Sequence, residues 1–79
     1  MYVELVYDRR NVSGLPNAEA LIRAELTKRI QRTFPDAEVK VKPMQTNAIN
    51  SNASKQDKSA INRIIEEMFN EADEWLVSD

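Results

Sequence analysis

The chain has 79 residues, which fits one small domain spanning 1–79, and its 11 basic and 13 acidic side chains give a net charge of −2. It contains no Cys and no His, which argues against disulfides, a structural zinc site and the most common general base. A single Gly argues against a glycine-rich phosphate-binding loop. We therefore expect a protein that is not an enzyme, with no catalytic residue, cofactor or bound metal.

No apolar run reaches the roughly 18 residues of a membrane span, and residues 1–10 lack the layout of a signal peptide. We expect a cytoplasmic protein that does not bind membranes and acts as a monomer.

The chain begins with "YVELVY", residues 2–7, whose aromatic and β-branched composition predicts a strand with Val3, Leu5 and Tyr7 on one face. A loop follows, with Gly14 and Pro16 as turn signals.

Residues 15–34 predict a helix because Ala18, Ile22, Leu26 and Ile30 recur at a spacing of four. The helix is expected to end at "FPD", since Pro35 disfavours helical geometry in the residue before it.

"AEVKVK", residues 37–42, alternates strictly and predicts a half-buried strand with Val39 and Val41 inward, closed by Pro43. Residues 46–51 fit either a short edge strand or a loop. The short connection favours an antiparallel orientation for such a third strand.

The last helix has a clear predicted start, since Ser54 followed by Asp57 resembles a capping box. Its apolar and acidic side chains fall on opposite sides, and it is expected to continue close to residue 79. Phe69 and Trp75 are expected in the core, and Trp75 could also anchor an interface. The predicted core from all the elements comprises Ile22, Leu26, Ile30, Val39, Val41, Ile61, Ile65, Met68 and Ala72.

These elements predict an α+β fold: a small three-stranded mixed sheet in the order β-α-β-β-α, with two helices packed on one face. A strand–helix–strand step favours a parallel pair with a right-handed crossover.

Charge is distributed unevenly along the chain. Residues 1–65 carry 11 basic and 7 acidic side chains, whereas residues 66–79 carry six acidic ones and no basic one. Charge runs of this kind are most often only solvated. Carboxylates near a helix C-terminus oppose the helix dipole, however, which indicates a role other than stability. The candidate protein-binding residues are Glu66, Glu67, Glu71, Asp73, Glu74 and Asp79.

A continuous helix would space these six charges at roughly 4 Å, close to the ~3.4 Å per phosphate of one DNA strand. Such a helix could compete for a surface built for nucleic acid, whereas its sign excludes direct DNA binding by the helix itself. The basic side chains before and on the first helix could contact phosphates, remain solvated, or pair with acids of the second helix. They are Arg9, Arg10, Arg23, Lys28, Arg29 and Arg32.

The stretches "RTFPD" and "EADEWLVSD" are the most specific parts of a pattern that covers essentially the whole chain. This pattern resembles the DNA-damage-inducible protein I (DinI) family. The resemblance implies a small non-enzymatic modulator that binds the RecA filament in the bacterial SOS response, through an acidic C-terminal helix that imitates DNA. Relatives of this kind also occur in prophages and enteric pathogens, some under virulence-related names.

Two other readings remain open from the sequence. The chain could be an acidic DNA mimic aimed at another basic protein, or a small nucleic-acid binder that uses the Arg-rich first helix. The last of these requires a salt-sensitive affinity for DNA alone.

Overall fold

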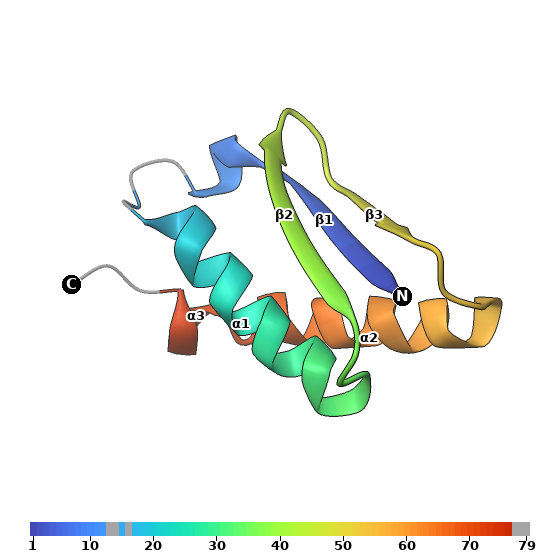
Figure 1. Cartoon of the computed structure of the whole chain (residues 1–79). Coiled ribbons are helices and arrows are strands. Elements are labelled where there is room, and N and C mark those ends of the chain that lie inside the picture. Colours follow the sequence, from blue (N-terminus) through green and yellow to red (C-terminus); the bar gives the residue numbers. More distant parts are fainter. Residues whose placement is uncertain (13–14, 16, 77–79) are drawn as a thin grey trace.

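The chain folds in the predicted order of strand, helix, strand, strand and helix, with short additional turns (Figure 1). A computed structural model describes residues 1–12, 15 and 17–76. The elements are β1 (Tyr2–Asp8), the 3-10 turn η1 (Arg9–Val12), α1 (Ala18–Thr33), β2 (Glu38–Met44), β3 (Ala48–Ser51), α2 (Lys55–Asn70) and α3 (Ala72–Trp75). Within these described residues, no helix is both long enough and apolar enough to cross a membrane.

The sheet has the strand order β2-β1-β3, with β1 parallel to β2 and antiparallel to β3. The predicted mixed sheet is confirmed, and residues 48–51 form the short edge strand rather than a loop. β3 pairs with β1 and not with the strand that precedes it in sequence. The connection crosses the end of β1, where the Asp8 amide donates to Asn47 Oδ1 at 2.8 Å.

Pro43 lies inside β2, opposite Tyr7, so the expectation that it ends the strand is wrong. The reason is the position of β2 at the edge of the sheet. An edge strand has backbone groups that no neighbouring strand uses, and a residue without an N–H is tolerated there.

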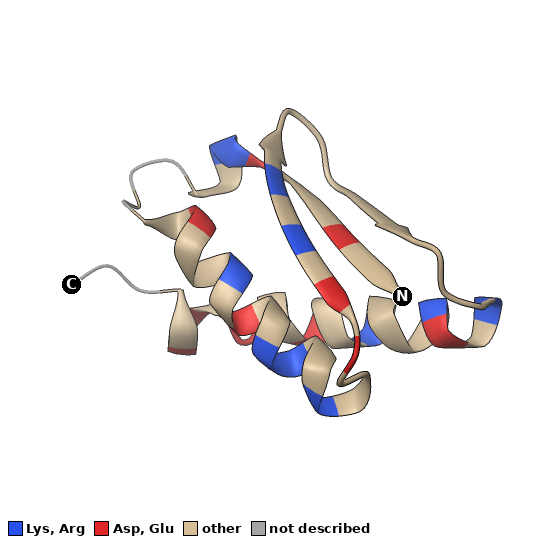
Figure 2. Cartoon of the chain, viewed as in Figure 1, with Lys and Arg blue, Asp and Glu red and all other residues tan. Residues whose placement is uncertain are grey.

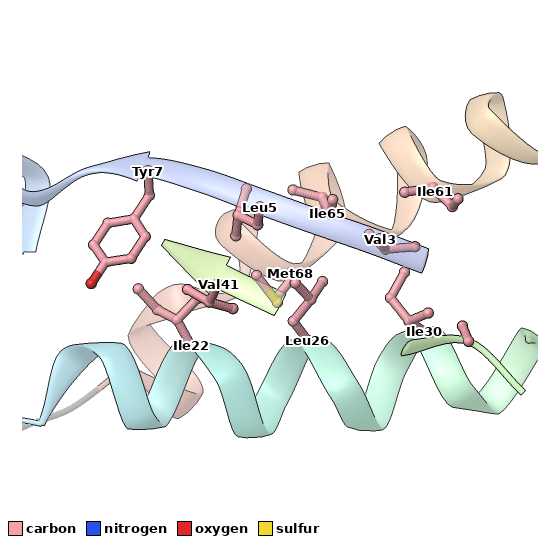
Figure 3. Packing of buried hydrophobic residues seen from close by; sticks show 11 residues of the cluster. Val3, Leu5, Tyr7, Ile22, Leu26, Ile30, Val41, Ile61, Ile65 and Met68 are labelled. Carbon is pink, nitrogen blue, oxygen red and sulfur yellow. The ribbon is translucent and has the colours of Figure 1, made fainter. Parts of the chain in front are cut away.

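Both main helices cover one face of the sheet (Figure 1). The core fills the space between this face and the two helices (Figure 3). Val3, Leu5 and Tyr7 point from β1 toward the helices and are buried. Val39 is only half-buried against this core, and Ala72 is half-buried outside the main cluster, which corrects the predicted core at these two positions. The side chains with less than 2% exposure are Val3, Ile22, Leu26, Ile30, Ile61 and Met68.

α2 begins with a side-chain N-cap, whereas α1 begins after Asn17 without one. α1 begins at Ala18, three residues later than predicted, and the Phe34 amide donates to the Ile30 carbonyl at 2.7 Å as α1 ends before Pro35. At the start of α2, Ser54 Oγ accepts a hydrogen bond from the Asp57 amide at 3.2 Å, which confirms the predicted cap. The cap satisfies one of the amides that the first turn leaves unpaired.

Candidate protein-binding surface

The acidic residues near the C-terminus lie at the end of α2, at the turn after it and on α3 (Figure 2). All those that the structure describes are exposed to solvent. We refer to these five as the acidic segment: Glu66, Glu67, Glu71, Asp73 and Glu74. Asp79, the sixth predicted residue, lies outside the described residues.

α2 ends at Asn70, so the expectation that this helix continues without a break toward residue 79 is wrong. Glu71 has φ −103° and ψ 18°, and its amide donates to the carbonyls of Glu67 at 3.1 Å and Met68 at 3.3 Å. The four-residue helix α3 begins directly after it. The acids therefore do not form a straight rod, and the comparison with the charge spacing of DNA does not extend beyond α2.

The break also changes the electrostatic argument for Asp73 and Glu74. Both lie on α3, whose four residues make its first turn its last turn as well, and the Glu74 amide donates to the Glu71 carbonyl. The helix-dipole argument therefore does not apply to these two acids. Glu66 and Glu67 remain near the end of α2, whose last turn contains no basic residue. The unfavourable placement that indicated a role beyond stability thus applies to the acids of α2 and not to those of α3.

The two acids of α2 have different surroundings. Successive helical residues point about 100° apart, so Glu66 and Glu67 occupy different flanks. Glu67 borders a shallow hollow together with Arg29 and Arg32 of α1. Glu66 lies one turn before Phe69, which is 37% exposed, so the assignment of Phe69 to the core is wrong.

Glu71 is the only member of the acidic segment that forms an ion pair within the described part of the chain. Arg29 Nη1 of α1 donates to Glu71 Oε1 at 2.6 Å, while Arg29 Nε donates to Glu25 Oε2 at 2.6 Å. The side chains of Arg29 and Glu25 are 19% and 11% exposed, and that of Glu71 is 49% exposed. One guanidinium thus joins an acid of its own helix to the turn after α2.

The pKa values around Arg29 follow from this contact. The hydrogen bond from Arg29 holds the pKa of Glu25 below its ordinary value, against the opposing effect of burial. The hydrogen bonds to Glu25 and to Glu71 raise the pKa of Arg29. Both groups therefore remain charged at neutral pH.

Trp75 ties α3 back to α2. Its indole Nε1 donates to the Met68 carbonyl at 2.7 Å, and the same carbonyl also accepts from the Glu71 amide at 3.3 Å. The rings of Trp75 and Phe69 are tilted, with centroids 6.1 Å apart. Trp75 and Leu76 also pack against the core, so the predicted burial of Trp75 is confirmed in part.

Basic side chains elsewhere pair mainly with acids close to them in sequence. Arg23 bonds Glu19 at 2.9 Å, and Lys28 approaches Glu25 at 3.6 Å. Arg10 of η1 binds Asp8, the last residue of β1, at 2.6 Å. Of the three possibilities for the basic residues, pairing with a distant acid is observed for Arg29, and its partner Glu71 lies in the turn directly after α2.

The chemistry that this surface offers is charge and shape. In the part of the chain that the structure describes, no three acidic side chains are arranged to hold a metal ion. Exposed carboxylates on a short, bent scaffold can bind a basic surface, because each retains free acceptor positions for Lys or Arg.

The sequence is similar to those of known proteins. Residues 16–76 match the sequence profile of the DinI-like family. The chain belongs to the DinI-like family. It is 61% identical, over the full length of both chains, to the virulence protein MsgA of Salmonella typhimurium strain LT2. It is 35% identical to the DNA damage-inducible protein I of Serratia marcescens, again over both full lengths. The DNA damage-inducible protein I of Escherichia coli K12 is 39% identical over 61 residues, which cover 73% of this chain and 75% of the relative.

Proposed function

We propose that this protein is a non-enzymatic modulator of the RecA filament in the cytoplasm of bacteria responding to DNA damage. Membership of the DinI-like family and the names of two relatives, DNA damage-inducible protein I, support the proposal. One structural observation carries it: within the described residues, four of the five acids of the acidic segment are exposed and have no ion-pair partner in the chain.

In this proposal the free carboxylates bind Lys and Arg side chains of a groove that otherwise holds DNA. Glu66, Glu67, Asp73 and Glu74 make direct contacts, while Glu71 is already occupied by Arg29. Asp79 extends the acidic surface in this proposal. Because α2 and α3 are separate helices, the imitation of DNA rests on charge distributed over a bent surface rather than on a straight row.

Fluorescence anisotropy with RecA filaments on single-stranded DNA tests this function. The chain has no Cys, so one Cys introduced at the exposed Gln56, about 15 Å along α2 from Glu66, accepts a single fluorophore. We expect saturable binding that weakens as salt rises, because salt screens exposed charges. Absence of binding to the filament at low salt would contradict the proposal.

The same titration with single-stranded and duplex DNA alone examines the nucleic-acid-binding alternative. We expect no salt-sensitive affinity for DNA, because the cations of α1 are largely occupied by Glu19, Glu25 and Glu71. Binding to DNA without RecA would favour the alternative.

A second candidate function is an acidic module aimed at another basic protein, such as a nuclease or repressor. The 61% identity to a protein named for virulence favours it, since that name does not refer to DNA damage. Affinity capture from lysate of DNA-damaged bacteria separates the two, with the wild type compared against Glu67→Gln/Asp73→Asn/Glu74→Gln. Recovery of RecA with the wild type alone supports the first function. Recovery of another basic protein in its place supports the second.

A further inference from the structure

We infer that Arg29 and Glu71 are positioning residues for the acidic segment. They fix the elbow, which we define as the turn at Glu71 together with α3. The acids of α2 and α3 then meet a partner as one preformed, bent surface. The binding half of this inference rests on the proposed function, whereas the structural half can be measured in the protein alone.

The guanidinium of Arg29 holds the elbow in a defined position relative to α1. Two different nitrogens of one planar guanidinium reach two carboxylates, Glu25 on α1 and Glu71 at the turn, each at 2.6 Å. A planar fork of this kind restricts direction as well as distance, which a Lys ammonium would not do. Glu25 is itself 11% exposed, so this end of the contact is largely shielded from solvent.

The position of Glu71 makes this tie effective. Its backbone closes α2 through the carbonyls of Glu67 and Met68, and its own carbonyl accepts from the Glu74 amide at 2.9 Å as α3 begins. A side-chain contact at this residue therefore constrains the direction in which α3 leaves α2. The bond from Trp75 to the Met68 carbonyl constrains the other end of α3.

A fixed elbow improves binding because the acids need not be ordered when the partner arrives. Immobilising a flexible segment at an interface costs binding free energy, and a segment that is already held avoids that cost. The acids of α2 and those of α3 then engage together rather than one after the other. Charge alone makes the opposite prediction for Arg29, since removal of a cation beside an acidic surface should strengthen binding to a basic partner.

The first test compares Arg29→Met with Arg32→Met. Both remove one positive charge beside Glu67, and Arg32 is exposed with no ion pair recorded in the described part of the chain. We expect Arg29→Met to weaken filament binding by about tenfold, as loss of a hydrogen bond between charged groups commonly does. Arg32→Met should bind as well as the wild type or slightly better.

The elbow itself is observed through Trp75, the only tryptophan in the chain. Quenching of its fluorescence by acrylamide, a neutral quencher, reports how far α3 opens from α2. We expect stronger quenching in Arg29→Met and wild-type quenching in Arg32→Met, while both circular dichroism spectra stay native.

The second test removes the same charge in two ways and does not depend on Arg29 variants folding. Glu71→Gln keeps an oxygen that can accept from Arg29, whereas Glu71→Ala does not. If Glu71 positions the elbow, Glu71→Ala should bind the filament more weakly than Glu71→Gln, by about fivefold to tenfold, and its Trp75 should be quenched more strongly. Equal losses of binding in the two variants would make Glu71 a direct charge contact and overturn the inference.

The outcomes separate this inference from the proposed function. A wild type that does not bind the filament refutes the proposed function and, with it, the binding half of the inference. Unchanged Trp75 quenching in Arg29→Met and Glu71→Ala refutes the fixed elbow whatever the filament does. Tighter binding of Arg29→Met would show that charge rather than position governs the surface.

Discussion

On α1, Glu19 and Glu25 are each bound by cations of the same helix, whereas Glu66, Glu67 and the acids of α3 have no ion pair in the part of the chain that the structure describes. Acids paired within the domain are not free to bind a partner, and the shielded Glu25 is the one expected to contribute to stability. Acids left exposed contribute little to stability and remain available. Glu71 lies in the acidic stretch of the sequence but belongs, through Arg29, to the paired group of α1. Position along the chain is therefore a poor guide to which acids are free.

The largest change in the free energy of unfolding is expected for substitution of Glu25, the most shielded acid of the paired group. Glu25→Ala removes one of the two carboxylates that pair with Arg29, whose side chain is largely buried. We expect this substitution to lower the free energy of unfolding by about 1–3 kcal/mol. Glu74→Ala on the exposed α3 should change it by less than about 0.5 kcal/mol. Urea denaturation of both variants measures the difference, and similar losses would remove the distinction between the two groups.

A smaller effect is expected at Glu71, because its side chain is 49% exposed and solvent screens the ion pair. Glu71→Lys places a cation against Arg29 and should lower the free energy of unfolding by about 1 kcal/mol. The helix dipole taken alone predicts no loss at all. Glu74→Lys is the matched control, and thermal unfolding should show a clear decrease in Tm only for the variant at 71.

The paired group should also make stability depend on pH. The folded-state pKa of Glu25 lies below its ordinary value of 4.5, so its contribution is fully present above pH 4.5 and is lost as the pH falls through the folded-state value. The hydrogen bond from Arg10 likewise lowers the folded-state pKa of Asp8, and the contribution of Asp8 to stability is lost as the pH falls below 3.8. Urea denaturation at a series of pH values gives the free energy of unfolding as a function of pH. Below pH 4.5 this free energy should fall less steeply with decreasing pH for Glu25→Gln than for the wild type. An identical slope would show that Glu25 contributes nothing to the acid sensitivity.

The smallest effect is expected for an unpaired acid of α2. Glu67 lies near the C-terminal end of a helix whose last turn has no cation, so Glu67→Gln should raise the free energy of unfolding by a few tenths of a kcal/mol. Gln56→Glu, at the other end of α2, is a useful companion, since an added acid there suits the dipole. A decrease in stability for Glu67→Gln would indicate that Glu67 interacts with Arg29 or Arg32 in solution.

Much of the fold could be predicted because local patterns and tertiary structure agree. Alternation in residues 37–42, the spacing of Ile22, Leu26 and Ile30, and the cap at Ser54 each correspond to an observed element. The continuation of β2 through Pro43 could not be predicted in this way, because tolerance of a proline depends on which strand occupies the edge of the sheet.

The candidate surface was less predictable than the fold. Exposure of the acids follows from the amphipathic pattern. The end of α2 at Asn70 could not be predicted, because no Gly or Pro follows it in the sequence. The Glu25–Arg29 pair was not predicted, although its spacing of four residues could have indicated it. The contact of Arg29 with Glu71 could not be predicted from the sequence, because it joins residues 42 apart and depends on how the two helices cross.

Binding of two matched triple variants to RecA filaments on single-stranded DNA tests the central claim most directly. Glu67→Gln/Asp73→Asn/Glu74→Gln neutralises three acids of the acidic segment. Its control neutralises three acids elsewhere, with the same change in net charge. The control substitutions are Glu4→Gln, Asp36→Asn and Glu38→Gln. Asp8 and Glu19 do not serve in the control, because they are bound by Arg10 and Arg23.

Asp36 and Glu38 are exposed, and a Gln at position 4 keeps an acceptor for the Asn50 amide that now donates to Glu4 at 3.0 Å. The account predicts that the first triple weakens filament binding by more than about tenfold, because its charges face the partner, while the control changes it by less than about twofold. Both variants should keep the native circular dichroism spectrum. Equal losses from the two triples would show that general charge drives association, and would contradict the claim that the acidic segment is the binding surface.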